Sequence, residues 1–320
     1  MNILVAISNE NFNNEQIKHI FDTDQALAGN QVYYEFDSPD VDLDQIDVMI
    51  GYDQKVLNQI LASPTAHLKW IQALSAGVDY YPLKELQAKQ ILLTTVNGIH
   101  AEPIAESTIG MILGQYRFLV ESARKQGWIK PTHSLNMIKG KRAAIFGTGH
   151  IGSRITELLE AFGAETVGVN HSGHPAAGFK ATVSTADLQT PQITGADIIV
   201  NALPLTKATT GMFNQAFFEA LTNQPIFISI GRGPSTNTDA LLAAIDDGKL
   251  GAAGLDVTDP EPLPADNPLW HRDNVLITSH ISGIHAEYLE EALQILNQNA
   301  AQFKQDGTVV INEVNYDKGY

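Results

Sequence analysis

The sequence contains no cysteine, which excludes disulfide bonds, thiol catalysis and thiolate metal sites. Basic residues are also scarce: 20 Lys and Arg stand against 36 Asp and Glu, a formal net charge of −16 at pH 7. Nucleic acid is therefore not an expected partner, because phosphate binding needs a basic surface. No apolar run approaches the roughly 20 residues that cross a membrane, and residues 1–7 lack the features of a signal peptide. We expect a cytoplasmic protein whose chemistry comes from His, Arg, Asp, Glu, Ser, Tyr or a cofactor.

Short apolar runs alternate with helical patterns along the chain, which is typical of an α/β fold with parallel sheets. The 320 residues exceed what one hydrophobic core usually supports, so two domains are expected. The runs that predict a first, smaller sheet are 3–7, 32–36, 48–50, 70–73 and 91–95. Those that predict a second sheet are 142–146, 165–170, 197–202, 226–230, 254–257 and 275–278. Helical patterns begin at Asn14 and cover 103–126 and 287–303.

The order of these segments predicts how two domains share the chain. The second sheet has the nearly continuous apolar strands of a doubly wound, Rossmann-type parallel sheet. We expect a dinucleotide-binding domain at residues 99–284, inserted into a smaller flavodoxin-like α/β domain that binds substrate, at residues 1–98 and 285–320. An acidic segment at residues 38–47 could hold a divalent cation. Its spacing matches no known cation loop, however, and a solvated connection is preferred.

A glycine-rich turn follows a predicted strand and opens a predicted helix, with the sequence Gly147-Thr148-Gly149-His150-Ile151-Gly152. In this context the first glycine permits the tight turn, the second lets the backbone approach a pyrophosphate, and the third lets helix and strand pack closely. The amides at the start of the helix point at the anion. The turn therefore predicts dinucleotide binding, against the alternative of a purely structural connection.

The end of the next strand indicates which dinucleotide is bound. NAD enzymes usually place a carboxylate there, about 20 residues after the glycine turn, to hold the ribose hydroxyls. Here the place is taken by Asn170, followed by His171 and Ser172, which can donate hydrogen bonds to a ribose phosphate. NADP is therefore favoured over NAD, although the loop has no arginine, the usual bidentate phosphate partner. His171 and His174 without a carboxylate are a poor ligand set, so no metal is expected.

Three charged residues follow separate predicted strands of the second sheet: Arg232, Glu261 and His280. Ligands of open α/β sheets bind at the carboxyl ends of the strands, so these side chains are candidates for one site. Each has an ordinary explanation when taken alone, as an arginine in a glycine turn, a glutamate in a proline loop, or a histidine at a strand end. Their combination and order carry the functional prediction.

The whole pattern resembles the D-isomer-specific 2-hydroxy acid dehydrogenases. The segments that carry the resemblance are 74–79, 97–106, the glycine turn, 202–206 with Thr209, 230–233, 255–257 with 261–264, 278–283, and the ending 318–320. They span nearly the whole chain. The resemblance implies that Arg232, Glu261 and His280 hold the family's catalytic positions, and that the protein forms a homodimer.

The same resemblance implies further residues at the two ligands. Ser75-Ala76-Gly77 would anchor the substrate carboxylate together with Arg232, although an ordinary turn would have the same composition. Beyond the glycine turn and the loop at Asn170, the residues implied at the cofactor are Leu203, Pro204, Thr209, Ile230, Gly231, Arg232, Asp256, His280, Ser282 and Gly283.

The roles of the three charged residues follow from the chemistry of 2-oxo acid reduction. Hydride addition to the carbonyl carbon places negative charge on the oxygen, so the site needs a proton donor and a cation. His280 would supply the proton and take it back in the reverse direction. Glu261 would favour the protonated imidazole and orient the ring. Arg232 would hold the substrate carboxylate and carbonyl in a planar fork.

The favoured interpretation is therefore an NAD(P)-dependent reductase of small 2-oxo acids that forms D-2-hydroxy acids. A nucleotide-sensing corepressor of the same fold, without metabolic turnover, is the alternative from another class, and a formate-oxidising enzyme is a third. Two departures from the family pattern touch no charged catalytic group. Residues 232–239 read Arg-Gly-Pro-Ser-Thr-Asn-Thr-Asp where the family commonly has Arg-Gly-x-x-Val-Asp, and Ser279 replaces the usual proline.

Overall fold

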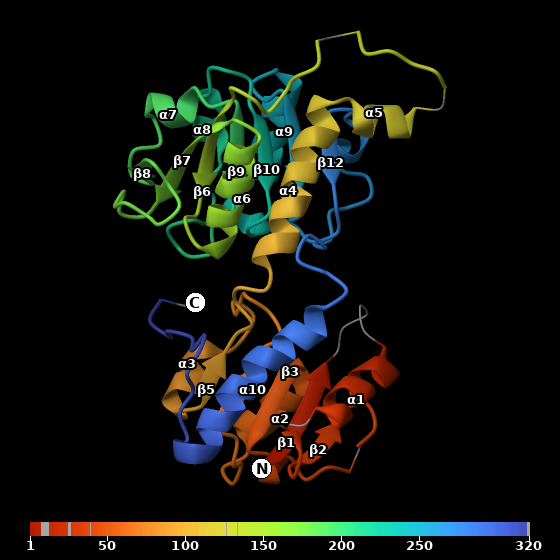
Figure 1. Ribbon diagram of the computed structural model, residues 1–320, viewed down its shortest axis with the longest axis vertical. Helices are drawn as coiled ribbons and strands as arrows, with labels where there is room; N and C mark the ends of the chain where they lie inside the picture. Colours follow the sequence, from red (N-terminus) through yellow and green to blue (C-terminus); the bar gives the residue numbers. More distant parts are fainter. Residues whose placement is uncertain (8–12, 25–26, 39, 126, 133, 319–320) are drawn as a thin grey trace. The chain divides into compact units, whose positions relative to one another are not determined.

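The computed structural model describes residues 1–7, 13–24, 27–38, 40–125, 127–132 and 134–318. The chain forms two compact units (Figure 1). Unit 1 comprises Met1–Ile99 and His285–Tyr320, and unit 2 comprises His100–Ile284. Each unit is built on a parallel sheet, which confirms the predicted α/β fold. The ligands predicted for the two domains stay predictions.

Unit 1 has five parallel strands in the order β2-β1-β3-β4-β5, an order typical of flavodoxin-like folds. The strands are β1 (Asn2–Ile7), β2 (Gln31–Tyr34), β3 (Val48–Tyr52), β4 (Trp70–Gln72) and β5 (Leu92–Thr94). The helices are α1 (Asn14–Thr23), the 3-10 helix η2 (Leu43–Gln45), α2 (Gln54–Ala62), α3 (Leu83–Ala88) and α10 (Tyr288–Asp306). Helices α1 and α10 cover one face, and α2 and α3 cover the other (Figure 1).

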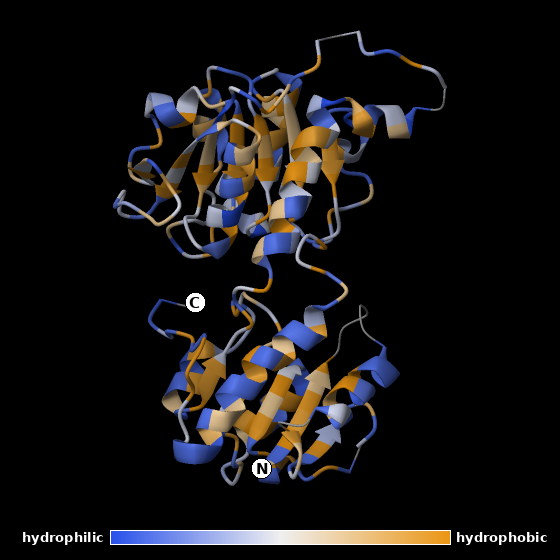
Figure 2. Cartoon of the chain, in the orientation of Figure 1, coloured by the Kyte–Doolittle hydropathy of each residue, from blue (hydrophilic) through white to orange (hydrophobic). Residues whose placement is uncertain are grey.

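Strand β1 illustrates why the apolar runs form central strands. Ile3 and Val5 pack into the core under α1 and α10, while Leu4 and Ala6 pack into the core under α2 and α3. Successive residues of a strand point to opposite faces, so a strand covered on both sides must be apolar throughout. The central strands are accordingly mostly orange, the hydrophobic end of the scale, in Figure 2.

Unit 2 has seven parallel strands in the order β12-β11-β10-β9-β6-β7-β8. The chain order reverses between β6 and β9, as in a doubly wound dinucleotide-binding sheet. The strands are β6 (Arg142–Phe146), β7 (Glu165–Asn170), β8 (Thr182–Ser184), β9 (Ile198–Asn201), β10 (Ile226–Ser229), β11 (Ala252–Leu255) and β12 (Val275–Ile277). The helices are α4 (Ala101–Tyr116), α5 (Leu119–Arg124), α6 (His150–Ala161), α7 (Pro191–Thr194), α8 (Gln215–Glu219), η3 (Gly233–Ser235), α9 (Thr238–Asp246) and η4 (Pro268–His271).

Two details differ from the sequence-based prediction. Strand β8 was not predicted, because its three residues are only half-buried at the edge of the sheet and lack an apolar run. The helix predicted at 103–126 is two helices, since Phe118 adopts a left-handed conformation with φ of 63° and separates α4 from α5. The predicted end of that helix, Gln126, and the ending Gly319-Tyr320 lie outside the described residues.

The acidic segment at residues 38–47 contributes to local structure. Asp42 caps η2 by accepting a hydrogen bond from the Asp44 amide, and Asp47 accepts one from the Asn2 amide at 2.9 Å. In the described part of the chain no group of three or more histidines and acids is arranged to hold a metal ion. None of its helices is long and apolar enough to cross a membrane.

Candidate active site

The glycine-rich turn joins β6 to α6 at the point where the strand order reverses. Gly147 has a left-handed φ of 101°, and a Cβ at Gly152 would lie 1.9 Å from the Gly147 carbonyl oxygen, so neither position tolerates a side chain. Gly149 is different, because a Cβ there would meet no atom within 4 Å. Gly149 is also the N-cap of α6, and no side chain caps the helix. The first amides of α6 therefore face an open approach, which fits the pyrophosphate of a dinucleotide.

Asn170 ends β7, as predicted, and its amide group orders the loop that follows. Its Oδ1 accepts a hydrogen bond from the Gly173 amide at 2.7 Å, and its Nδ2 donates to the His174 carbonyl at 3.0 Å and to Thr148 Oγ1 at 3.4 Å. Asn170 thus joins the glycine turn to the loop at 171–174. The side chains of that loop that can reach an incoming phosphate are the exposed His171, Ser172 and His174.

The loop after β9 contains three of the predicted cofactor residues and is fixed by its own threonines. Thr209 Oγ1 donates to the Pro204 carbonyl at 2.7 Å and accepts from the Thr206 amide at 2.8 Å. Leu203 donates its amide to Asn201 Oδ1 at 3.2 Å. These hydrogen bonds hold the loop in one conformation. The loop also packs directly against the glycine turn, because a Cβ on Gly147 would lie 2.7 Å from the Ala202 carbonyl oxygen.

Asn201 is a positioning residue that the sequence did not single out. It ends β9, is fully buried, and donates to Ser229 Oγ at 3.1 Å and to Ser235 Oγ at 2.8 Å. Ser235 Oγ in turn donates to the Arg232 carbonyl at 2.6 Å. Asn201 therefore supports the turn that carries Arg232. A polar residue at the end of a buried strand was the available signal.

His280 and Glu261, predicted to act together, lie side by side. His280 Nδ1 and Glu261 Oε1 are 2.6 Å apart, and the two side chains are 49% and 41% exposed. The second oxygen of Glu261 accepts a hydrogen bond from the Thr258 amide at 3.4 Å. Because Nδ1 is held by the carboxylate, Nε2 is the ring nitrogen that can exchange a proton with a ligand.

Asp256 holds the segment that carries His280. Its carboxylate is 2% exposed and accepts hydrogen bonds from Thr278 Oγ1 at 2.6 Å, from the Ile281 amide at 2.9 Å, and from both the amide and the hydroxyl of Ser282. His280 has a left-handed φ of 54°, and its amide donates to the Asp256 carbonyl at 2.9 Å. The family resemblance implied that Asp256 and Ser282 lie at the cofactor; in the structure both side chains order the histidine segment.

Arg232 lies in the turn after β10, and this turn packs against the segment that leads to Glu261. A Cβ at Gly233 would lie 1.8 Å from the Thr258 carbonyl oxygen, so the two backbones touch. A Cβ at Gly231 would lie 2.6 Å from the Leu203 carbonyl oxygen. The glycines on both sides of Arg232 thus allow three strand ends to approach one another. Unit 2 in this way brings together the segments that carry Arg232, Glu261 and His280.

The predicted substrate anchor lies in unit 1, directly after β4. Ser75 Oγ donates to the Gly77 carbonyl at 2.8 Å and lies 2.7 Å from the Tyr80 hydroxyl. Among the described residues, no protein acceptor takes a hydrogen bond from the amides of Ala76 and Gly77. Two neighbouring amides without a protein partner are suited to a carboxylate.

Three features of unit 2 together indicate the class of protein. A doubly wound sheet, an uncapped glycine turn at its reversal point, and a histidine–carboxylate pair at neighbouring strand ends are typical of a dinucleotide-dependent oxidoreductase.

Comparison with known proteins identifies the family. Residues 109–282 match the NAD binding domain of the D-isomer specific 2-hydroxyacid dehydrogenases. The chain is 35% identical to human glyoxylate reductase/hydroxypyruvate reductase over 233 residues, 70% of each chain. It is also similar to the crystal structure of an NADPH-dependent glyoxylate/hydroxypyruvate reductase from Sinorhizobium meliloti in complex with NADP and sulfate, with a TM-score of 0.84, 26% identity and coverage of 100% and 99%. A phosphoglycerate dehydrogenase from Lactobacillus plantarum has 39% identity, a TM-score of 0.56 and coverage of 98% and 100%.

The chain therefore belongs to the D-isomer specific 2-hydroxyacid dehydrogenase family, as the sequence pattern predicted. It is an NAD(P)-dependent oxidoreductase that interconverts 2-oxo and 2-hydroxy acids. Nothing in these comparisons supports the corepressor-like alternative.

Proposed function

We propose that this enzyme reduces small 2-oxo acids such as glyoxylate and hydroxypyruvate to D-2-hydroxy acids, with unit 2 binding NADPH and unit 1 contributing the substrate anchor. The observation that carries the proposal is the pair of His280 and Glu261, 2.6 Å apart, in the same unit as the uncapped glycine turn. The human and Sinorhizobium relatives, whose names state this activity, support the choice of substrate.

Each residue of the site has a separate role in the proposed reaction. Bound NAD(P)H supplies the hydride. His280 donates the proton from Nε2 to the carbonyl oxygen as negative charge develops there, and Glu261 holds the ring by Nδ1. Arg232 holds the substrate carboxylate and carbonyl in a planar fork, and the amides of Ala76 and Gly77 bind the carboxylate.

The preference for NADPH rests on the end of β7. No carboxylate lies there to repel a ribose phosphate, and the exposed His171, Ser172 and His174 can donate hydrogen bonds to one. Because Asn170 is engaged inside the loop, its proposed role is to present these neighbours. The NADP bound by the Sinorhizobium relative supports the preference.

A homodimer is proposed as the working form. In support, exposed apolar side chains gather in α5 and the segment after it, namely Leu119, Trp128, Ile129, Leu135 and Met137, and Trp128 is 96% exposed. Covering them with a second copy would remove apolar area from water. Light scattering should give twice the 34.8 kDa of one chain, and Trp128→Ser should shift the population toward monomer. A wild-type monomer at all concentrations would refute the dimer. The cytoplasmic location stays a prediction.

The activity is tested with a panel of 2-oxo acids and both reduced cofactors, followed by loss of reduced-cofactor absorbance and by chiral analysis of the product. We expect glyoxylate and hydroxypyruvate to be reduced faster with NADPH than with NADH. Arg232→Ala should impair substrate capture more than cofactor binding. Reduction of none of the acids would refute the proposed function, and preference for NADH would refute the proposed cofactor.

A further inference from the structure

A hydrogen bond joins the first residue of α10 to the loop that carries the substrate anchor. The Tyr288 hydroxyl donates to the Leu74 carbonyl at 2.6 Å, and Leu74 directly precedes Ser75-Ala76-Gly77. The two bonded residues are 214 positions apart in the chain, but both belong to unit 1. A carbonyl can only accept, and burial holds the pKa of the Tyr288 phenol well above its ordinary value, so the hydroxyl is the donor at neutral pH.

The Tyr288 side chain is held in place by its surroundings. It is 7% exposed and lies in the core under α1 and α10, against which Leu74 also packs. Its ring meets that of His285 edge to face, with centroids 5.5 Å apart, and His285 Nε2 lies 3.4 Å from Glu291 Oε2. His285 is the first residue of unit 1 after the chain leaves unit 2. The hydroxyl is therefore presented to the loop by a packed ring.

A second polar contact fixes α10 to the strand that leads into the anchor. Asn299 is fully buried and lies eleven residues after Tyr288, about three turns along the helix, so the two side chains share one face of α10. Asn299 Nδ2 donates to Gln72 Oε1 at 3.4 Å, and Gln72 is the last residue of β4. Helix α10 thus contacts the end of β4 through Asn299 and the loop after it through Tyr288.

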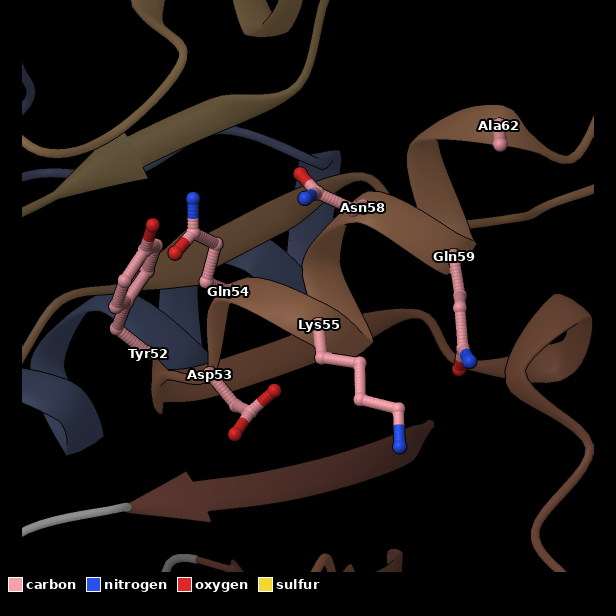
Figure 3. Close-up of a pocket in the computed structure, with 7 residues that line it drawn as sticks. All are labelled: Tyr52, Asp53, Gln54, Lys55, Asn58, Gln59 and Ala62. Carbon is pink, nitrogen blue, oxygen red and sulfur yellow. The ribbon is translucent and has the colours of Figure 1, made fainter.

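The far end of the same loop is held from β3. The Tyr52 hydroxyl donates to the Tyr80 carbonyl at 3.2 Å, and the Tyr81 hydroxyl donates to the Gly51 carbonyl at 3.0 Å. Figure 3 shows that Tyr52 extends away from Asp53, the residue that caps α2. Hydrogen bonds between phenols and backbone carbonyls therefore fix the loop on both sides of the anchor, from α10 directly before it and from β3 after it.

The carbonyls of the loop determine where its amides point. The Ser75 carbonyl accepts from the Val96 amide at 3.3 Å. In a trans peptide the carbonyl and the following N–H point in opposite directions, so the Ala76 amide is directed away from Val96. The bond from Tyr288 fixes the peptide group immediately before this one. Removing that bond frees the peptide group to rotate, which lowers the fraction of molecules whose amides are arranged for a carboxylate.

We propose that Tyr288 is a positioning residue for substrate binding, whose hydroxyl holds the loop after β4 so that the amides of Ala76 and Gly77 are arranged for the substrate carboxylate in advance. A preorganised loop binds its ligand more tightly than one that is ordered only on binding. The inference rests on the proposed function, because it takes this loop as the carboxylate anchor. Loss of the hydroxyl should weaken substrate capture and spare proton transfer and cofactor binding, since His280 and the glycine turn belong to unit 2.

The test compares wild type with Tyr288→Phe, which keeps the ring and removes only the hydroxyl. The KM for glyoxylate and the inhibition constant of oxamate, an unreactive analogue of a 2-oxo acid, should each rise about tenfold, the worth of one hydrogen bond. The kcat should fall by less than about threefold, and the Kd of NADPH should change by less than about twofold.

Tyr316→Phe is the matched control, because the Tyr316 hydroxyl also donates to a backbone carbonyl of unit 1, that of Ile91. Ile91 precedes β5, whereas the anchor follows β4, so the two sites lie at opposite edges of the parallel sheet. Tyr316→Phe should lower the melting temperature about as much as Tyr288→Phe does. It should leave the KM for glyoxylate and the inhibition constant of oxamate within about twofold of wild type.

The activity of wild type separates this inference from the function on which it rests. Reduction of none of the 2-oxo acids by wild type would overturn both. An unchanged KM and inhibition constant in Tyr288→Phe, an equal rise in Tyr316→Phe, or a fall in kcat without a rise in KM would overturn the inference alone. Assays at low temperature keep a destabilised variant folded. A Tyr288→Phe protein that stays unfolded there would assign the hydroxyl to the fold of unit 1 and would also overturn the inference.

Discussion

Replacing Asp256 by Asn tests how the position of His280 is maintained. The substitution keeps the size of a buried side chain and removes its charge. One carboxylate oxygen accepts from Thr278 Oγ1 at 2.6 Å and from the Ile281 amide at 2.9 Å, and the other accepts from the amide and the hydroxyl of Ser282. An asparagine can present an oxygen to only one of these pairs, so its NH2 group must face a backbone amide donor and a hydroxyl that has to rotate to accept.

The magnitude follows from these bonds. Two hydrogen bonds to a charged acceptor are lost, each worth about 1.5 kcal/mol at the lower end of the range, and the remaining two weaken because the charge is gone. We expect Asp256→Asn to lower the free energy of unfolding of unit 2 by about 3 kcal/mol. We also expect kcat to fall, because the left-handed conformation of His280 at φ 54° loses its support.

Urea unfolding and steady-state kinetics with NADPH measure both effects, and Asp266→Asn is the matched control. Asp266 is exposed, so its substitution should change the free energy of unfolding by less than about 0.5 kcal/mol. Wild-type stability and kcat in Asp256→Asn would refute the reasoning. Unchanged stability with a raised KM for NADPH would instead favour the direct cofactor contact that the family resemblance implies.

Three further predictions concern backbone contacts and pH. Gly152→Ala places a Cβ 1.9 Å from the Gly147 carbonyl oxygen, so NADPH affinity by fluorescence titration should fall at least about tenfold; wild-type affinity would contradict this. Gly233→Ala places a Cβ 1.8 Å from the Thr258 carbonyl oxygen. We expect kcat/KM to fall about a hundredfold, while NADPH affinity changes little. Unchanged kcat/KM with weakened NADPH affinity would refute the proposed role of the turn that carries Arg232. Burial raises the pKa of Tyr316 from 10.0 to about 12. The stability that the protonated Tyr316 hydroxyl contributes is therefore intact below pH 10 and is lost as the pH rises toward 12. Tyr316→Phe should not show this alkaline loss of stability, and identical melting curves of wild type and variant at alkaline pH would contradict the prediction.

The fold was largely predictable because its strands are buried on both faces. The run at β1 is apolar at every position, and this pattern identified the strand without knowledge of its neighbours. Strand β8 escaped prediction because it is short and half-buried, and the break at Phe118 escaped because no glycine or proline marks it. Local sequence carries little information where burial or backbone conformation is decided by distant contacts.

The candidate site was predictable in position more than in detail. Arg232, Glu261 and His280 could be predicted as candidates for one site because each follows a predicted strand, and parallel strands end at one edge of a sheet. The sequence could not show that the side chains of Asn170 and Asp256 would form hydrogen bonds to the protein backbone, in the loop after β7 and in the segment that carries His280. Which donors meet a polar side chain depends on tertiary packing, and Asn201 was overlooked for the same reason.

The central claim is that His280, held by Glu261, donates the proton in 2-oxo acid reduction. It is tested most directly by measuring kcat for glyoxylate and the dissociation constant of NADPH in wild type, His280→Ala and Glu261→Gln. A general acid contributes about 100-fold to 10,000-fold to rate, so His280→Ala should lower kcat within that range, Glu261→Gln should lower it less, and NADPH affinity should be retained in both. A kcat within a few fold of wild type in His280→Ala would contradict the claim.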